Sequence, residues 1–469
     1  MISVVKSLNL RTTLTSNIPI IAVLLGASLV AVSIGPFQNP DTTWEFKAAT
    51  GVVTWGMPFV EVQGSLINQP PLGFYAQGLF LSIFGVSIES GVFLVRLFGL
   101  GCILMMYLLG KEVYGKRAGL LASVLFTLAP WQMVLSNAFL IDTQCLFLSL
   151  AALYVGLLAF KDNSNKLLFV AGVLFALAFY TKLFAVFALI PLFLFYLYLQ
   201  PKQQRSLPIK LPLFFLPLVV TTLVWYMVVF YMMPSYLPRD LGYMYMHSDF
   251  DDLNPVGVAP SIYFVGNFLV NYGLGYLFVA AVILSVILGL TFRKQICKKA
   301  FAADLIFAGS ILLVLGLILY LGFSLNLKVP YTSTIKYAYQ TLPLFCLLAA
   351  SLSVKSVAIL RTAQMQHRLR KAVFGAVGFL GVLLPPLALL VNVYSIHLLS
   401  MVGFIVFRVE PDQLLGYSFD NFTPVHADSP LLHVQVVGFI LILCSLLYWV
   451  RELIVDFRLK QSTLNPQTH

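Results

Sequence analysis

Apolar runs of about 20 residues recur along the whole chain, and they limit the folds that it can adopt. A helix needs about 20 mostly apolar residues to cross a bilayer. Of the 469 residues, 60% are hydrophobic and only 10% are charged. Inside a membrane, backbone polar groups must bond to one another, which leaves helices and closed barrels as spanning structures. Barrel strands alternate polar and apolar residues, and these runs do not. We therefore predict an all-α polytopic membrane protein.

We expect about twelve spans, which would put both termini on one side of the membrane. The expected spans are 17–36, 88–110, 117–136, 142–160, 167–181, 183–200, 211–233, 261–292, 301–325, 337–354, 372–394 and 431–450. The first run also fits a cleavable signal peptide. We prefer an uncleaved span, because the later loops alternate correctly only if it is counted.

The distribution of charge predicts the orientation. The connections on the side of both termini hold 22 of the 29 basic residues but 5 of the 18 acidic ones. Basic loops face the cytoplasm, so we expect cytoplasmic termini. The net charge of +11 is then a determinant of topology, and no nucleic-acid partner is expected. Topology does not require the acids to gather outside, and their position suggests chemistry on the non-cytoplasmic face.

The connections also suggest how the chain is divided. Three outer connections are long, namely 37–87, 234–260 and 395–430, whereas the inner loops are too short for a nucleotide-binding domain. We expect a catalytic membrane module at 1–233, a loop at 234–260, a variable membrane module at 261–460 and a tail at 461–469. The five cysteines show no CxxC pattern, so neither a metal site nor a disulfide framework is indicated.

The first outer loop is acidic, rich in proline and longer than a simple connector needs to be. Two of its segments, Thr43–Trp55 and Pro71–Phe84, have the character of interfacial helices. Asp41 precedes the first of them. An aspartate there is a favoured helix N-cap, and it is equally well placed to act as a base at the membrane surface. Both roles can hold together.

Two further charged residues stand at the outer ends of apolar runs. Asp142 begins the expected fourth span, where it either caps the helix or has a function, as charges in spans generally do. Lys182 interrupts apolar sequence between the fifth and sixth spans. Its side chain could extend to the interface or contact a phosphate.

The remaining candidates are weaker. Lys336 and Arg239 are candidate phosphate contacts, and Glu45, Gln69, Pro70 and His247 are expected to support the loops around the site. The acidic run 249–252 could bind a hard cation, but an exposed acidic loop is the commoner explanation. Metal dependence is therefore left open. Glu89 and Arg96 share one helix face, and we expect a structural role, with Arg96 pairing with an outer acid.

Together these segments resemble one family. The residues that carry the resemblance are Asp41, Pro70-Pro71-Leu72, Gly85, Glu89, Arg96-Leu97, residues 115–120, Asp142, residues 177–182 and the Lys336-Tyr337…Leu342-Pro343 segment. Their order and spacing resemble the GT-C superfamily of integral-membrane glycosyltransferases, in the branch of protein O-mannosyltransferases and the lipid A aminoarabinose transferase. The likeness covers about the first 200 residues well and the remainder loosely.

The resemblance implies that a sugar moves, with inversion, from a polyprenyl-phosphate donor to a protein, lipid or glycan acceptor. The family's first-loop acid maps to Asp41, its second outer acid to Asp142 and its lysine after the fifth span to Lys182. Relatives often carry Lys or His before the Pro-Pro pair, where this chain has Gln69. The resemblance therefore gives no phosphate or metal contact at that position.

Three other classes of protein are alternatives to a membrane glycosyltransferase. A transporter or lipid flippase should place charges or Gly/Pro breaks at mid-membrane in two related halves. Here charges collect at the outer ends of spans, and the halves look unrelated. A ligase or polymerase of lipid-linked glycans is the nearest enzymatic rival. A non-catalytic scaffold would not explain the acidic first loop.

Overall fold

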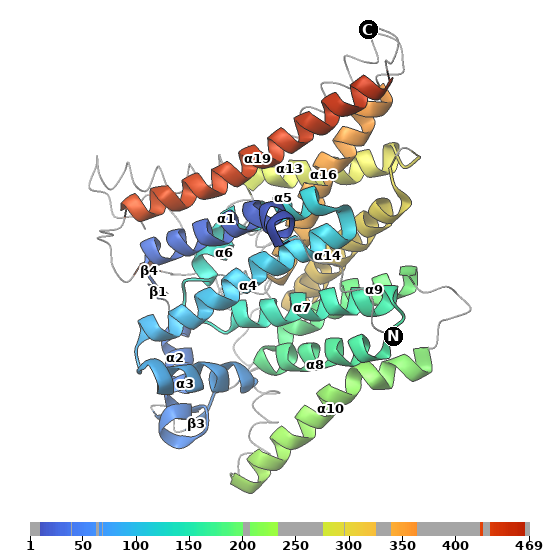
Figure 1. Ribbon diagram of the computed structural model, residues 1–469. Coiled ribbons are helices and arrows are strands. Elements are labelled where there is room, and N and C mark those ends of the chain that lie inside the picture. The colour runs from blue at the N-terminus through green and yellow to red at the C-terminus, as the bar shows by residue number, and fades with distance from the viewer. Residues whose placement is uncertain are drawn as a thin grey trace.

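The computed structural model describes residues 10–38, 40–61, 65–67, 69–199, 207–232, 275–294, 296–324, 339–363, 423–424 and 432–464. Nearly all of these residues are helical (Figure 1). The α-helices are α1 (Leu10–Ile34), α2 (Pro40–Trp55), α3 (Leu72–Phe84), α4 (Ile88–Tyr114), α5 (Lys116–Leu128), α6 (Pro130–Leu135), α7 (Asp142–Lys161), α8 (Asn165–Thr181), α9 (Leu189–Leu199), α10 (Leu207–Met232), α13 (Gly275–Thr291), α14 (Lys298–Ser324), α16 (Leu342–Ala363) and α19 (Leu432–Leu464).

The described residues include seven helices that are long and apolar enough to cross a membrane. They lie in α1, α4, α7, α10, α14, α16 and α19, and shorter apolar helices accompany them. The prediction of an all-α polytopic membrane protein is confirmed. The count of twelve is not established, since the expected span 372–394 lies outside the described residues.

The expected span 117–136 is broken near its C-terminal end. α5 ends at Leu128, and α6 starts at Pro130. Proline has no N–H to donate, and it disfavours helical backbone at the residue before it. Ala129 is accordingly extended, with φ −66° and ψ 123°. The break lets the segment after α6 turn back towards the start of α7.

Consecutive helices run back and forth between two ends of the bundle. At one end lie the turn between α4 and α5, the turn between α7 and α8, and the start of α10 (Figure 1). Ion pairs join the helices there, with Glu112 Oε1 3.0 Å from Lys161 Nζ and 3.4 Å from Lys299 Nζ. We call this the basic end. α1, α6 and α8 finish at the opposite end, where α4 and α7 begin.

α1 and α19 bring the two ends of the sequence together. They cross at Gly26 and Gly438, where an added Cβ would lie 2.6 Å and 2.7 Å from a backbone oxygen of the other helix. Ser445 donates a hydrogen bond to the carbonyl of Pro19, and Trp449 donates one to that of Arg117. The C-terminal part of α19 therefore runs towards the basic end, beside the first half of α1.

The first outer loop forms a small layer at the end opposite the basic end. α2 and α3 flank a short hairpin of β2 (Phe59–Val60) and β3 (Ser65–Leu66). β1 (Phe37–Gln38) pairs antiparallel with β4 (Thr423–Pro424). Both expected helices of this loop are present. The first begins at Pro40, earlier than predicted, because the fixed φ of proline suits the first position of a helix.

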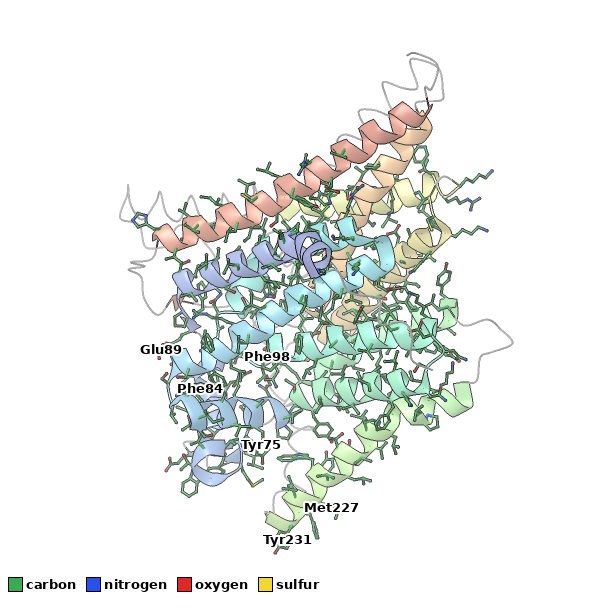
Figure 2. All side chains as sticks on the ribbon, viewed as in Figure 1. Tyr75, Phe84, Glu89, Phe98, Met227 and Tyr231 are labelled. Atoms are coloured by element: carbon green, nitrogen blue, oxygen red, sulfur yellow. The ribbon has the colours of Figure 1, made fainter. Side chains whose placement is uncertain are left out.

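α10 is the most exposed spanning helix. Only 11% of its most apolar stretch is buried, and Met227 and Tyr231 are 71% and 86% exposed (Figure 2). Apolar side chains on such a helix face the hydrocarbon of the bilayer. Tyr75 of α3 meets Trp225 of α10 edge to face, with ring centroids 6.4 Å apart. This contact ties α10 to the layer of the first loop.

Two charges that were counted on the side of both termini, Asp304 and Lys355, lie well inside helices. Asp304 belongs to α14 and Lys355 to α16, and they are 2% and 1% exposed. Asp304 Oδ2 lies 2.6 Å from Lys355 Nζ, so the charges compensate one another. Tyr114 of α4 donates a hydrogen bond of 2.7 Å to the same carboxylate. They are therefore packing residues, not loop charges.

Candidate active site

Asp142 and Lys182 meet where two adjacent helices end. Asp142 is the first residue of α7, and Lys182 is the C-cap of α8. The helices run antiparallel, so these two ends lie side by side. The positive end of a helix dipole favours a carboxylate, and the negative end favours an ammonium ion. Lys182 Nζ lies 2.6 Å from Asp142 Oδ2, and the two residues are 5% and 3% exposed.

Glu45 of α2 completes this cluster. Its Oε1 lies 3.9 Å from Lys182 Nζ, and its Oε2 accepts a 2.8 Å hydrogen bond from the backbone N–H of Ile141. N–H groups at the start of a helix have no partner within the helix, and this carboxylate supplies one at the start of α7. Glu45 is 1% exposed. We call Glu45, Asp142 and Lys182 the ionic cluster.

The backbone before Asp142 is held from two other sides. The N–H of Phe37 in β1 donates a 2.8 Å hydrogen bond to the carbonyl of Asn137. Phe139 packs so closely on α4 that a Cβ added to Gly91 would lie 1.8 Å from its ring. The segment from Asn137 to Ile141 is therefore fixed by β1, α2 and α4, and it sets the position of the Asp142 carboxylate.

Asp41 lies in the first turn of α2, one turn before Glu45. Residues four apart on a helix share a face, with Cβ atoms about 5–6 Å apart. Asp41 is half-buried, whereas Glu45 is fully buried. α2 thus carries one carboxylate into the ionic cluster and a second one nearer to its rim. Because α2 begins at Pro40, Asp41 is inside the helix and is not the N-cap that the sequence suggested.

The structure brings together only part of the predicted set. Glu45, Asp142 and Lys182 are in direct contact, and Asp41 is one helical turn away. Gln69 and Pro70 lie half-buried just before α3, and their expected support of the site stays a prediction. Lys336, Arg239 and His247 lie outside the described residues.

The sequence analysis underrated Glu45, which was expected only to support the loop. It is in fact a member of the ionic cluster. The signal that could have revealed it is its spacing of four residues from Asp41 in a helical segment. Arg96 was expected to pair with an acid. Its Nε donates to the amide oxygen of Asn137, at 2.8 Å, and the acids of the outer connections 234–260 and 395–430 lie outside the described residues.

The ionic cluster contains two carboxylates and one ammonium ion, so it carries one net negative charge when all three groups are ionised. Among the described residues, no group of three His, Cys, Asp or Glu side chains is placed to hold a metal ion. The cluster can present a fixed ammonium ion to an anion, and Asp41 can accept a proton at its edge. Together these features define an integral membrane protein with an acid–lysine site at the end opposite the basic end.

Known proteins share part of this sequence and its overall fold. Residues 68–231 match the family described as dolichyl-phosphate-mannose-protein mannosyltransferase. Over nearly the whole chain, the fold is similar to that of ArnT from Cupriavidus metallidurans in its crystal structure with undecaprenyl phosphate. The TM-score is 0.54, with 14% identity, over 96% of this chain and 79% of ArnT. The resemblance to the GT-C superfamily is thereby confirmed.

Two proteins of Bacillus subtilis (strain 168) are similar in sequence, and both are provisionally assigned as mannosyltransferases. YycA is 31% identical over 157 residues, and YkcB is 29% identical over 132 residues. These matches cover 33% and 28% of this chain, but only 22% and 18% of the relatives. The matches to these two relatives thus cover about a third of the chain or less.

Proposed function

We propose that the protein is an inverting glycosyltransferase that moves a sugar from a polyprenyl-phosphate donor to a protein, lipid or glycan acceptor. The observation that carries this proposal is the buried ionic cluster with Asp41 one turn away. The family match includes two members of this site, Asp142 and Lys182. The GT-C fold supports the same class of reaction.

In this reaction, Asp41 is the general base. The acceptor hydroxyl gives its proton to the Asp41 carboxylate, and the acceptor oxygen attacks C1 of the sugar from the face opposite the phosphate. The bond between C1 and the phosphate oxygen breaks, and polyprenyl phosphate leaves with the electron pair. The new glycosidic bond has the inverted configuration. Phosphate is a good leaving group, so a strong general acid is not needed.

Lys182 stabilises the charge that develops on the departing phosphate. An ammonium ion has three N–H donors, so a lysine bound to Asp142 can still contact a phosphate oxygen. Asp142 and Glu45 hold Lys182 in place, and fixed charges of this kind stabilise a transition state without reorganisation. Lys336 and Arg239 are proposed as further phosphate contacts. Asp142 is also proposed to orient the acceptor or a divalent cation.

The site is proposed to face the non-cytoplasmic side of the membrane. Lys111, Lys116, Arg117 and Lys161 gather at the basic end, whereas the ionic cluster lies at the other end. Loops rich in Lys and Arg stay in the cytoplasm. The first turn of α1 and the last turns of α19 lie towards the basic end, which supports cytoplasmic termini.

A panel of radiolabelled donors tests the proposal. The purified protein in lipid nanodiscs is incubated with polyprenyl-phosphate sugars or with nucleotide sugars, together with peptide, lipid and glycan acceptors. We expect at least one polyprenyl-phosphate sugar to be converted into polyprenyl phosphate and a labelled acceptor of inverted configuration. Consumption of nucleotide sugars alone would contradict the proposed donor. Donor movement across a sealed bilayer without consumption would support a flippase.

A further inference from the structure

Arg96 is a charged residue within a spanning helix that the proposed reaction does not use. It lies in the outer half of α4 and is half-buried. Its Nε donates to Asn137. Within the part of the chain that the structure describes, no carboxylate lies within ion-pair distance of the guanidinium, and the Nη groups make no hydrogen bond. Charged residues in membrane spans are generally paired or functional. The guanidinium ion therefore has two donor groups available to a ligand.

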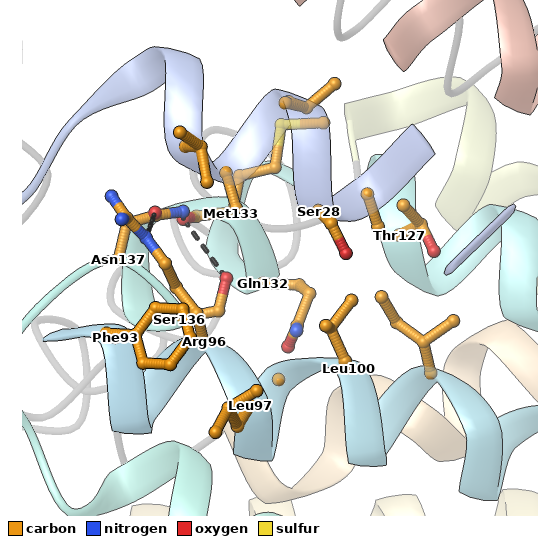
Figure 3. Close-up of a pocket in the computed structure, with 16 residues that line it drawn as sticks. Ser28, Phe93, Arg96, Leu97, Leu100, Thr127, Gln132, Met133, Ser136 and Asn137 are labelled. Carbon is orange, nitrogen blue, oxygen red and sulfur yellow. Dashed lines mark hydrogen bonds between the residues drawn. The ribbon is translucent and has the colours of Figure 1, made fainter. Parts of the chain in front are cut away.

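The guanidinium lies at one side of a pocket of about 260 Å³ between α1, α4, α5 and α6 (Figure 3). Its lining is mainly apolar. The lining includes Ala31, Val32, Phe93, Arg96, Leu100 and Ile103. An apolar cavity of ~150 Å³ is enough to bind benzene, so this pocket has room for a length of hydrocarbon chain.

The hydroxyl groups of Ser28 and Thr127, which line the pocket, already have partners in the protein. Ser28 Oγ donates to the carbonyl of Leu24 at 2.9 Å, and Thr127 Oγ1 donates to that of Ser123 at 2.8 Å. Gln132 Oε1 accepts the hydroxyl proton of Tyr339. In the described part of the chain, the donors of this pocket that have no protein acceptor are the Nη groups of Arg96 at one end and the amide N–H groups of Gln132, while the wall at Leu100 and Ile103 is apolar.

The mouth of the pocket opens on the apolar surface of the bundle. Val32 of α1 and Phe93 and Leu97 of α4 line it, and they are 47%, 49% and 45% exposed. In a bilayer such side chains face lipid, so the pocket is reached from the hydrocarbon layer. A ligand that enters this way has a chain to bury and a polar group to leave near Arg96.

We infer that this pocket binds an anionic glycerophospholipid from the leaflet at the end of the bundle opposite the basic end. Its phosphate would accept two parallel hydrogen bonds from the Nη groups of Arg96, since a guanidinium fork matches phosphate geometry. One acyl chain would fill the pocket between α1 and α4. Basic pockets between spanning helices are known to hold lipid head groups.

This lipid site is separate from the proposed donor site and does not depend on the proposed function. The ionic cluster is built on the far side of the 137–141 segment, from α2 and the ends of α7 and α8. The lipid site is built from α1 and α4, with α5 and α6 behind them. A bound phospholipid would brace Asn137, which Arg96 already contacts.

Native mass spectrometry of the purified protein tests this inference. The protein is transferred from nanodiscs of phosphatidylglycerol, phosphatidylcholine or phosphatidylcholine with added polyprenyl phosphate, and the retained lipid is identified. We expect the wild type to retain one phosphatidylglycerol. Arg96→Gln should reduce retention by at least tenfold, whereas Arg293→Gln, at an exposed arginine of the basic end, should leave it unchanged.

A second variant keeps the test decisive if Arg96→Gln folds poorly. Ala31→Phe adds bulk at the mouth without changing charge, and it should also abolish retention while the protein stays monodisperse. Equal retention of phosphatidylglycerol by the wild type and both variants would overturn the inference. So would preferential retention of polyprenyl phosphate, which would make this pocket part of the donor site.

Discussion

At the scale of single residues, the ionic cluster places three ionisable groups where water is largely excluded. Taking an ion out of water costs several kcal/mol even after the protein relaxes. Each charge of the cluster therefore depends on its neighbours, and Lys182 is balanced by Asp142 at 2.6 Å and by Glu45 at 3.9 Å. This mutual dependence fixes the ammonium ion in one place, as a phosphate contact requires.

Asp142 and Lys182 should show strong coupling. Removal of Lys182 leaves two buried carboxylates without a counter-ion, so Lys182→Met alone should destabilise the protein by about 3–5 kcal/mol. Asp142→Asn leaves Lys182 with Glu45 at 3.9 Å and should cost less. The double variant should lose much less than the sum of the two. Thermal or denaturant unfolding in detergent gives the free energy of unfolding of the wild type, the two single variants and the double variant. Additive losses would show that the two side chains do not act as a pair.

The Glu45 carboxylate should stabilise the start of α7 through its hydrogen bond to Ile141. Glu45→Ala leaves that buried N–H without a partner, at a cost of about 1–3 kcal/mol. Glu45→Gln keeps an acceptor and should recover most of that loss, although it removes the charge near Lys182. Glu61→Gln, at an exposed position, is the control. Equal losses from the Ala and Gln variants would contradict this role.

At the scale of elements, the positions of the three charges of the ionic cluster depend on where helices begin and end. They are set by the ends of α2, α7 and α8 and by the segment before α7. Hydrophobic runs predicted most of these helices, because apolar length is a strong signal in a membrane protein. They could not predict that α5 stops at Leu128 and α6 restarts at Pro130, or that Glu45 bonds to Ile141 across 96 positions. Those features depend on packing between distant segments.

The same limit applies to Arg96, Asp304 and Lys355. Arg96 was expected to pair with an outer acid, and Asp304 and Lys355 were counted only as charges on the side of both termini. The structure gives Arg96 an amide partner and buries Asp304 against Lys355. A single sequence shows that a charge interrupts apolar residues, but not which distant side chain compensates it. Asp142 and Lys182 were singled out correctly because they stand at the ends of helices, where dipoles favour their charges.

Gly91 should be required for the position of the Asp142 carboxylate. Gly91→Ala places a Cβ 1.8 Å from the ring of Phe139, so the 137–141 segment must shift. We expect a lower melting temperature and a reduced rate of sugar transfer. Gly309→Ala is a matched control, because nothing lies within 4 Å of an added Cβ there and alanine favours helix. A Gly91→Ala protein with unchanged melting and transfer would contradict the proposed packing.

At the scale of the whole molecule, contacts cross between the predicted modules 1–233 and 261–460. α19 packs along α1, and Tyr114 of α4 bonds to Asp304 of α14. Lys355 also donates to the backbone carbonyl of Ser285 at 2.8 Å, which brings α13 into the same network. Four helices from both predicted modules thus meet at one buried ion pair.

Breaking this pair should loosen the second half of the protein from the first. Lys355→Met leaves the Asp304 carboxylate buried without its counter-ion, so we expect a loss of about 3–5 kcal/mol. The double variant Lys355→Met/Asp304→Asn should regain a large part of the stability that the single variant loses. Hydrogen exchange of α13, α14 and α16 is the measurement. Unchanged protection in the single variant would contradict a joining role for this pair.

The most direct test of the central claim is the initial rate of sugar transfer by the wild type, Asp41→Asn and Asp162→Asn, at matched binding of a polyprenyl-phosphate donor. Asp162 is an exposed carboxylate at the basic end and serves as the control. General-base catalysis contributes about 10²–10⁴ in rate. We predict a loss of that size for Asp41→Asn, with donor binding retained, and none for Asp162→Asn. Equal rates for all three proteins would contradict it.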